Sequence, residues 1–293
     1  MGLEIRQLHP LFAAEVSNVE LSRPLDAETV AAIDAAMDRY AVLVFRGQAL
    51  TQGEQVAMAR QFGTLDLGLK KLKKQAERME HDEIIDISNV DTDGGIADRE
   101  SRKVVSNIAN QLWHSDSSFQ RPAGKYSMLH AVVLPSWGGE TEFADLRAAY
   151  DALPDGMKAE LEGKEAEHSA LHSRIMLGDT GYTEAQRAMM PPVRWPLVRT
   201  HPGSGRKLLF VGVHAHRIEG MALAEGRMLL SDLLEHATQR QFVYRHEWRV
   251  GDLVMWDNRA TLHRGRRYDL NEPRELRRTT CDQVPPEPAR SAA

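Results

Sequence analysis

Asn110-Gln-Leu-Trp-His-Ser-Asp116 is the segment from which the rest of the sequence can be interpreted, because it places a histidine two positions before an aspartate. In an extended strand, side chains at positions i and i+2 point to the same face. We therefore expect His114 and Asp116 to project together as neighbouring ligands of one metal ion. A second histidine would complete a set of two histidines and one carboxylate, which leaves coordination positions open for Fe(II) oxygen chemistry. We predict that His263, which follows Trp256-Asp-Asn-Arg259, is this ligand.

A histidine two places before an acidic residue is not informative by itself. With 12 histidines and 42 acidic residues in 293 positions, chance predicts 12 × 42 / 293, or about 1.7 such pairs, and the chain has two. The second pair, His81 and Glu83, lies in a run rich in Lys, Glu and Arg, where we expect a solvated surface. The case for His114 and Asp116 therefore depends on the rest of the chain.

Composition and charge describe a soluble globular protein of one large domain or two ordinary ones. The chain has 42% hydrophobic and 27% charged residues and a formal net charge of −5, which argues against binding to nucleic acid or to an anionic membrane. The first residues lack the basic and apolar regions of a signal peptide, and no apolar run of about 18 residues could span a bilayer. A single cysteine, Cys281, excludes an intramolecular disulfide and a cysteine-based metal cluster. We expect a cytoplasmic protein.

The first third of the chain predicts helices and a buried strand that support a site located elsewhere. Asp26 can cap a helix, residues 41–45 are wholly apolar, and Thr51 with Glu54 forms a capping box that opens a second helix. Residues 70–82 are dense in charge and predict a solvated helix or a mobile loop. The alternative for this segment is a lid whose lysines attract an anionic substrate.

Short strands dominate the second half of the chain. We expect strands at 126–134, 141–144, 195–200, 207–213, 242–248, 252–256 and 276–281, with helices after Asp145, after Pro154 and at 224–236. Because neither an internal repeat nor a parallel β-α-β rhythm is present, the pattern predicts an antiparallel barrel or jelly roll with helices outside it. Residues 172–193 have no clear period and predict an insertion or lid. Residues 285–293 predict a disordered tail after a single domain over residues 1–284.

Two arginines near the C-terminus predict an anion-binding cavity. Arg274 and Arg278 are four positions apart, so both side chains would face the same side of a regular strand. Two inward guanidinium groups are costly to bury unless each pairs with an anion. Arginine also binds a carboxylate through two parallel hydrogen bonds. We infer a cavity beside the metal that is built for two carboxylate groups.

These positions together resemble a known family. The order His114-x-Asp116, Thr141, Trp256-Asp-Asn-Arg-x-x-x-His263, Arg274 and Arg278 is similar to that of the taurine/2,4-D group of Fe(II)/2-oxoglutarate dioxygenases. The members that act on aryloxyacetates such as 2,4-dichlorophenoxyacetate also resemble the chain over residues 8–14, 110–119, 147–154 and 251–259. The likeness runs from about residue 8 to residue 280. It implies a mainly β fold with flanking helices around a double-stranded β-helix, or jelly-roll, core.

The resemblance assigns the ligands of the metal and of the cosubstrate. His114, Asp116 and His263 would bind Fe(II), and no further catalytic residue is implied. Thr141 and Arg274 would bind the distal carboxylate of 2-oxoglutarate, whose keto acid end chelates the iron. O2 would be the second cosubstrate.

Four residues are candidates for substrate binding. Arg278 would bind the carboxylate of the substrate, and Asn110 matches a position that contacts substrate in the taurine-oxidising members. His214 and His216 lie in the run Val211-Gly-Val-His-Ala-His216, which alternates, so the two histidines would share a face. For these two histidines, a place in the substrate cavity and a structural hydrogen-bonding role are both open.

The implied reaction couples the oxidative decarboxylation of 2-oxoglutarate, to succinate and CO2, with hydroxylation of an aryloxyacetate at the carbon beside its ether oxygen. The resulting hemiacetal would collapse to a phenol and glyoxylate. Three alternatives are open: the same class of enzyme acting on taurine or another sulfonate or alkyl sulfate, a zinc hydrolase with the same ligands, and a non-catalytic jelly-roll binding protein. We expect a small-molecule partner and neither nucleic acid nor a membrane, and we leave a homo-oligomer open.

Overall fold

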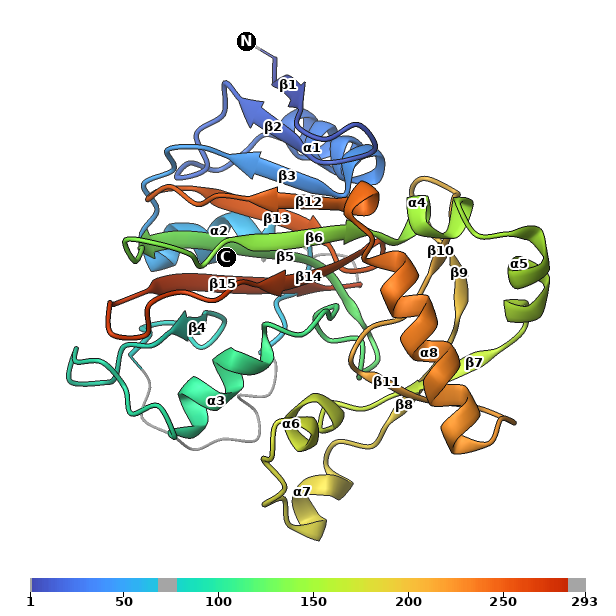
Figure 1. Ribbon diagram of the computed structural model, residues 1–293. Helices are drawn as coiled ribbons and strands as arrows, with labels where there is room; N and C mark the ends of the chain where they lie inside the picture. The colour runs from blue at the N-terminus through green and yellow to red at the C-terminus, as the bar shows by residue number, and fades with distance from the viewer. Residues whose placement is uncertain (1, 68–77, 284–293) are drawn as a thin grey trace, which may run out of the picture.

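Two β-sheets packed face to face form the core of the computed structural model, which describes residues 2–67 and 78–283 (Figure 1). The larger sheet has the strand order β1 (Glu4–Gln7), β2 (Ala14–Ser17), β3 (Val42–Phe45), β13 (Leu253–Asp257), β5 (Gly124–Val133), β15 (Glu275–Asp282) and β4 (Ile85–Ser88). The smaller sheet has the order β12 (Val243–His246), β6 (Thr141–Asp145) and β14 (Thr261–Gly265). The pair β2–β3 is parallel and the other pairs in these sheets are antiparallel. The predicted jelly-roll core is confirmed.

The helices of the first third begin where the sequence predicts. Helix α1 (Ala27–Tyr40) is capped by Asp26, whose side chain accepts a hydrogen bond from a first-turn amide. Helix α2 (Gln52–Arg60) opens with the Thr51–Glu54 capping box. Both start signals depend on residues within one helical turn. They can therefore be recognised in the sequence whatever the helices pack against in the fold.

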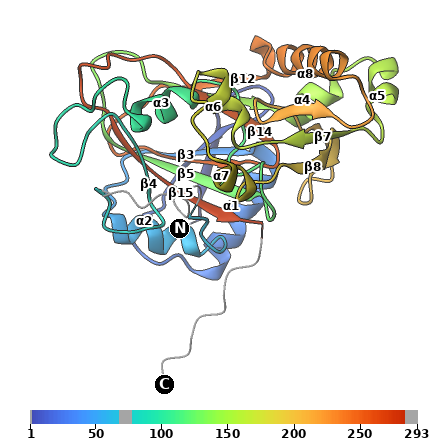
Figure 2. The same cartoon turned by 90° about the horizontal axis from the view of Figure 1, so that it is seen from below.

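The central strands of the larger sheet are buried on both faces, as their continuous apolar runs predict. Along β3, Leu43 and Phe45 belong to the apolar cluster that contains α1 and α2. Val42 and Val44 belong instead to the cluster that reaches Phe143 in the smaller sheet. Figure 2 shows this layering, with α1 and α2 on one side of the larger sheet and β12 and β14 on the other. Strands that carry site residues are therefore held between two apolar layers.

A further apolar cluster contains most of the remaining regular elements. Its elements are α4 (Leu146–Asp151), α5 (Asp155–Leu161), β7 (Glu165–His168), β8 (Val193–Pro196), β9 (Val198–Thr200), β10 (Lys207–Leu209), β11 (Ala215–Ile218), α8 (Leu223–Ala237) and the short 3-10 helix η2 (Arg240–Phe242). The predicted hairpin is present as β9–β10, with its turn at 201–205. The predicted strand at 195–200 is divided between β8 and β9.

Three helices of the structure have no counterpart among the elements that the sequence predicts. Helix α3 (Arg102–Ala109) follows Ser101, whose side chain caps it, in a stretch without an assignment. Helices α6 (His172–Met176) and α7 (Glu184–Ala188) lie within the segment predicted as an irregular insertion or lid. A helix of five residues is too short to show a 3.6-residue period, which explains the absence of a periodic signal there.

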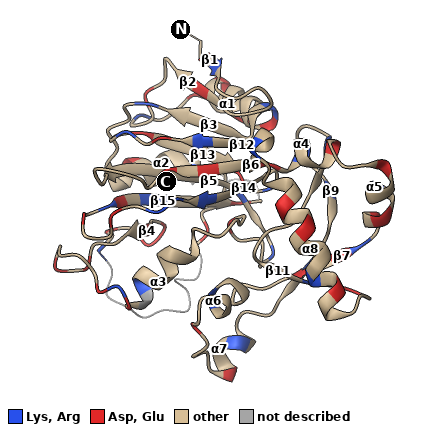
Figure 3. Ribbon diagram, viewed as in Figure 1, with Lys and Arg blue, Asp and Glu red and all other residues tan. Residues whose placement is uncertain are grey.

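Most of the predicted lid at 70–82 and the predicted tail at 285–293 lie outside the described residues. Arg78, near the end of the former, is described and pairs with Asp86 and Glu275. Figure 3 shows acidic and basic residues interspersed over helices and strands. Within the described ranges, no helix combines the length and the apolar character that crossing a bilayer requires.

Candidate metal centre

His114, Asp116 and His263 meet where the segment before β5 crosses β14. His114 and His263 form an isolated bridge, in which the amide of each donates to the carbonyl of the other at 3.0 and 2.8 Å. Asp116 lies in the turn that follows, and Ser117 has a left-handed φ of 56°. The predicted extended strand through His114 and Asp116 is therefore wrong, because the chain turns directly after the bridge. The two side chains nevertheless reach the same point.

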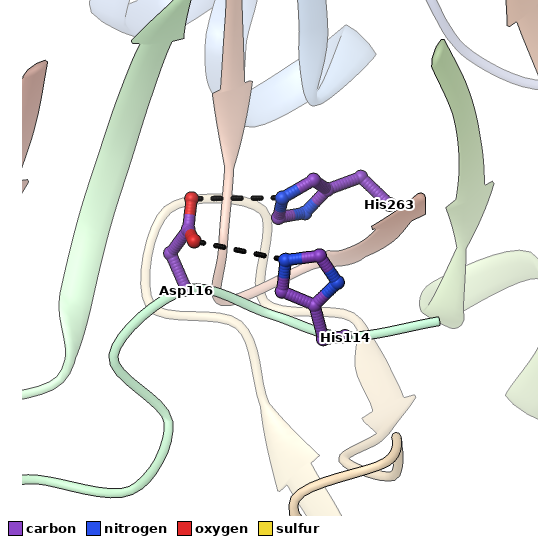
Figure 4. Close-up of side chains that lie close together, drawn as sticks. All are labelled: His114, Asp116 and His263. Atoms are coloured by element: carbon purple, nitrogen blue, oxygen red, sulfur yellow. Dashed lines mark ion pairs between the residues drawn. The ribbon is translucent and has the colours of Figure 1, made fainter. Parts of the chain in front are cut away.

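The three side chains present their ligand atoms to one another (Figure 4). The Nε2 atom of His114 lies 3.9 Å from Oδ1 of Asp116, and the Nε2 atom of His263 lies 3.6 Å from Oδ2 of Asp116. All three ligand atoms lie within 4.8 Å of one another, and all three residues are buried. This spacing and this set of donors fit a single divalent metal ion.

Contacts behind the two imidazole rings fix their orientation. The Nδ1 atom of His114 lies 2.7 Å from the carbonyl oxygen of Leu112. Because a carbonyl oxygen only accepts, Nδ1 carries the proton and Nε2 keeps its lone pair for a metal. The ring of His263 packs instead against Trp256, at 4.6 Å between centroids, and against Phe143, at 6.3 Å.

The charge state of the cluster suits a cation. Burial lowers the pKa of His114, and burial together with the nearby His114 holds the pKa of His263 well below its ordinary value. Burial of Asp116 opposes its ionisation, but the Arg278 guanidinium, helped by the hydrogen bond from Ser127, holds its pKa well below the usual range. Two neutral imidazoles and one carboxylate are the protonation states that bind a metal.

Two residues without a role in the sequence analysis hold Asp116 in place. The Ser127 hydroxyl donates to Oδ2 of Asp116 at 2.7 Å, and the Asn258 side-chain amide donates to the Ser127 hydroxyl at 3.0 Å. The Asn258 side-chain oxygen accepts the Asp116 amide and the Trp256 indole N–H, each at 3.0 Å. Asn258 could have been found, because it lies in the Trp-Asp-Asn-Arg segment. Ser127 has no signal in the sequence.

A cavity of about 50 Å³ adjoins His263. Five of the predicted site residues line it, namely Asn110, Thr141, His263, Arg274 and Arg278. Four polar residues that were not predicted as site residues also line it, namely Asn107, Gln111, Arg266 and Tyr268. Two of these lie on or just after α3, so the helix that was missed supplies part of the wall.

The Arg274 side chain reaches the cavity beside the turn at Gly139. Its side chain is 6% exposed, and Nη2 donates to the Gly139 carbonyl at 3.0 Å. Gly139 has a φ of 75°, and a Cβ there would lie 2.9 Å from the Arg274 Nε. The Tyr268 ring lies 5.1 Å from the guanidinium, and burial lowers the pKa of Arg274 to about 10. Among the described residues its Nε is buried without a hydrogen-bond partner, so a donor remains for an anion.

Arg278 lies between the cavity and the metal ligands. Its Nη1 donates to Oδ1 of Asp116, and among the described residues its Nε is buried without a hydrogen-bond partner. The structure thus places both arginines on the cavity wall, as their spacing predicted. A carboxylate that binds the remaining Arg278 donors would lie next to the metal ligands.

The other three substrate candidates lie in different places. Asn110 ends α3 and lines the cavity. His214 is buried, with its ring 5.9 Å from that of His114 and its Nδ1 3.0 Å from the Ser118 hydroxyl. His216 does not share its face: its Nε2 lies 3.2 Å from Glu167. The register shift between residues 215 and 217 on β11 breaks the alternation that the sequence analysis assumed.

A second group of possible metal ligands, Asp38, His201 and Asp257, has its ligand atoms equally close together. Arg259 donates to both oxygens of Asp257, and Nε2 of His201 lies 3.0 Å from Oδ2 of the same carboxylate. The Nδ1 atom of His201 accepts the Ser204 amide at 3.0 Å. Because these hydrogen bonds occupy the lone pairs of His201 and Asp257, two of the three possible ligands are already used, and this group is a structural ion pair and not a metal centre.

A jelly roll that brings two histidines and one carboxylate together beside inward arginines has the architecture of a mononuclear non-haem iron oxygenase. Residues 4–280 match the family described as "Taurine catabolism dioxygenase TauD, TfdA family". The chain belongs to this family of dioxygenases and is an oxidoreductase.

Relatives and solved structures agree with this assignment. The alpha-ketoglutarate-dependent 2,4-dichlorophenoxyacetate dioxygenase of Cupriavidus pinatubonensis is 61% identical over 280 residues, which cover 96% of this chain and 98% of that protein. The (S)-phenoxypropionate/alpha-ketoglutarate-dioxygenase of Sphingobium herbicidovorans is 38% identical, with 93% and 92% of the two chains covered. The crystal structure of AAD-2 in complex with Mn(II) and N-oxalylglycine has a TM-score of 0.90 and 46% identity, and covers 97% of this chain and 99% of its own.

Proposed function

We propose that the protein is an Fe(II)- and 2-oxoglutarate-dependent dioxygenase that hydroxylates aryloxyacetates such as 2,4-dichlorophenoxyacetate at the carbon beside the ether oxygen. The products are a phenol and glyoxylate, formed with succinate and CO2. The observation that carries the proposal is a cavity that His263, Arg274 and Arg278 line together, with the other two metal ligands adjacent. The names of relatives that are 61% and 38% identical support the substrate class.

The roles of the metal and cosubstrate ligands follow from their donors. His114, Asp116 and His263 hold Fe(II), which with 2-oxoglutarate supplies the activation of O2. Thr141 and Arg274 bind the distal carboxylate of 2-oxoglutarate. The Nε of Arg274, which is buried without a hydrogen-bond partner in the part of the chain that the structure describes, supports this role, because a buried cationic donor is costly until it pairs with an anion.

Arg278 binds the substrate carboxylate and thereby positions the reacting carbon. Its contact with Asp116 means that any carboxylate on its other donors lies beside the metal ligands. The methylene next to that carboxylate is then held close to the site of oxygen activation. Arg278 therefore contributes by orienting the substrate and not by stabilising charge. His214, buried against His114, and Asn110, on the cavity wall, complete the substrate side of the site.

Anaerobic reconstitution followed by O2 tests this function. The protein is loaded with Fe(II) and 2-oxoglutarate and then exposed to O2 with aryloxyacetates, aryloxypropionates, taurine or an alkyl sulfate. We expect phenol and succinate in equal amounts from aryloxyacetates. Sulfite or an aldehyde without phenol would instead support the sulfonate and sulfate alternative, and turnover without O2 would support a hydrolase. Substrate binding without succinate release would point to a binding protein.

The single domain over residues 1–284, the cytoplasmic location and a homo-oligomer stay predictions. The partner that the family supports is a small molecule.

A further inference from the structure

The hydroxyl of Thr141 has a partner that the proposed function does not use. The indole Nε1 of Trp248 donates to the Thr141 Oγ1 at 3.0 Å. Thr141 begins β6, where it lies between His246 of β12 and Gly265 of β14, and its side chain lines the cavity. Trp248 follows β12 by two residues and is half-buried. The sequence gives no hint of this contact, because 107 positions separate the two residues.

The chemistry of the two groups fixes the direction of the hydrogen bond. An indole N–H only donates, whereas a hydroxyl has one hydrogen and two lone pairs. The bond from Trp248 therefore occupies a lone pair of Thr141 and leaves the hydroxyl hydrogen to be donated elsewhere. A carboxylate only accepts, so a Thr141 hydroxyl turned in this way is prepared to bind one.

The indole is itself held by a short chain of contacts. The rings of Trp248 and His246 meet edge to face, with 4.5 Å between their centroids. His246 is buried, with Nε2 3.1 Å from Asp252 Oδ2 and Nδ1 3.2 Å from the Tyr244 hydroxyl. Trp248 also packs against the apolar cluster between the two sheets. The donor that faces Thr141 is thus fixed by the fold and not by the ligand.

We propose that Trp248 is a positioning residue for 2-oxoglutarate, acting through Thr141. By keeping the Thr141 hydroxyl as a donor, it completes, with Arg274, a pair of donors for the distal carboxylate. Preorientation of this kind strengthens binding because the hydroxyl does not have to reorient when the ligand arrives. The inference rests on the proposed function of Thr141, and the experiment separates the two.

The test is a double-mutant cycle on 2-oxoglutarate binding. Trp248→Phe removes the N–H and keeps a ring, and Thr141→Val removes the hydroxyl and keeps the shape. The dissociation constant of 2-oxoglutarate is measured without O2 on Fe(II)-loaded protein, from the visible charge-transfer absorption of the complex. We expect Thr141→Val to weaken binding about 10- to 100-fold and Trp248→Phe about 3- to 10-fold. In the Thr141→Val background, Trp248→Phe should change it by less than about 2-fold.

Three controls distinguish positioning from a loss of structure. Thr141→Ser keeps the hydroxyl, so Trp248→Phe should weaken binding again in that background. Trp195→Phe removes another buried indole donor, the one that bonds to the Ser118 carbonyl at 2.7 Å, and should leave 2-oxoglutarate binding unchanged. Turnover by Trp248→Phe at saturating 2-oxoglutarate, and its Michaelis constant for the aryloxyacetate, should stay close to the parent values. If the Phe variant does not fold, 3-benzothienylalanine at position 248 replaces the N–H with sulfur at nearly constant shape.

The outcomes separate the two ideas. Unchanged binding in Thr141→Val would overturn the proposed role of Thr141 itself. A weakened Thr141→Val together with an unchanged Trp248→Phe would overturn only the inference about Trp248. An effect of Trp248→Phe that is equally large with and without the Thr141 hydroxyl would show that the indole acts through packing, which also overturns it.

Discussion

Two histidine–carboxylate clusters in this protein have nearly the same composition and differ in their surroundings. The metal cluster consists of His114, Asp116 and His263, and the arginine-bound cluster consists of Asp38, His201 and Asp257. In both, the ligand atoms lie within 4.8 Å of one another. Residue type and spacing alone would therefore assign a metal to each.

The hydrogen bonds at Asp257 and at Asp116 explain why the metal cluster, and not the arginine-bound cluster, can take a metal. Asp257 accepts four, from the amide, Nε and Nη2 of Arg259 and from His201, so all four of its lone-pair positions are occupied. Asp116 accepts two side-chain hydrogen bonds among the described residues, from Ser127 and Arg278, and two lone pairs remain. A metal site is thus defined by lone pairs that the fold leaves free.

The strongest test of the comparison removes a carboxylate from the metal cluster. Asp116→Ala should abolish turnover and stable Fe(II) binding, because two neutral imidazoles alone retain a hard cation poorly. Succinate release at saturating Fe(II) and the iron content of the isolated protein measure this. His201→Gln in the arginine-bound cluster is the matched control and should keep one iron per chain. Persisting turnover in Asp116→Ala would place the metal elsewhere.

The second test removes the carboxylate that Arg259 binds in the arginine-bound cluster. Asp257→Ala should lower the free energy of unfolding by about 3–5 kcal/mol, because it leaves the buried Arg259 without its counter-charge. Urea denaturation of the metal-free protein measures the loss. Iron content of the folded protein should not change. A variant that loses iron and keeps its stability would reverse the roles of the two clusters.

A third test concerns the arginine that contacts the metal cluster. Arg278→Ala should weaken the binding of an aryloxyacetate by about 1.5–3 kcal/mol, the range for a charged hydrogen bond. The Michaelis constant would then rise roughly 10- to 100-fold. Arg277→Ala, on the same strand and paired with Glu275, is the matched control and should leave the constant unchanged. If both variants behave alike, Arg278 does not bind the substrate.

The smallest effect comes from a buried histidine that belongs to neither cluster. His168 is 1% exposed, and burial, reinforced by the charge of Arg199, lowers its pKa to about 3. Unfolded histidine titrates near 6.5, so the unfolded state binds more protons below that pH and stability falls as the pH falls. This residue should contribute a slope of about 1.4 kcal/mol per pH unit from pH 6.5 downward.

Urea denaturation of the parent and of His168→Phe between pH 7 and pH 5 measures that slope. The variant should lose stability more slowly with falling pH, because its side chain does not titrate. Equal slopes would mean that His168 is protonated in the folded protein. A steeper slope in the variant would contradict the direction of the shift.

Local chemistry accounts for what could be predicted from the sequence. The caps at Asp26 and Thr51 and the apolar run of β3 act over a few residues, so they can be interpreted without knowledge of the fold. The spacing of Arg274 and Arg278 predicted that both would face one wall, and both line the cavity, although Arg274 lies just before β15 and is held by its hydrogen bond to the Gly139 carbonyl. Helices α6 and α7 were missed because five residues contain too little of a helical period.

The errors came from places where tertiary contacts override a regular pattern. The turn after His114 and the register shift at β11 both break the alternation of a strand, and neither is encoded by a glycine or proline at that point. Contacts made across more than a hundred positions, such as Ser115 with Thr261 and Trp248 with Thr141, leave no local trace.

The sequence by itself determined which side chains could serve as ligands, because the donor atoms of histidine, aspartate and arginine belong to the residues themselves. Only the tertiary structure decided which of two similar clusters keeps its lone pairs free. That outcome depends on where Arg259, Ser127 and Arg278 direct their hydrogen bonds. Hydrogen bonds act over about 3 Å, so their pattern exists only after distant segments have packed together.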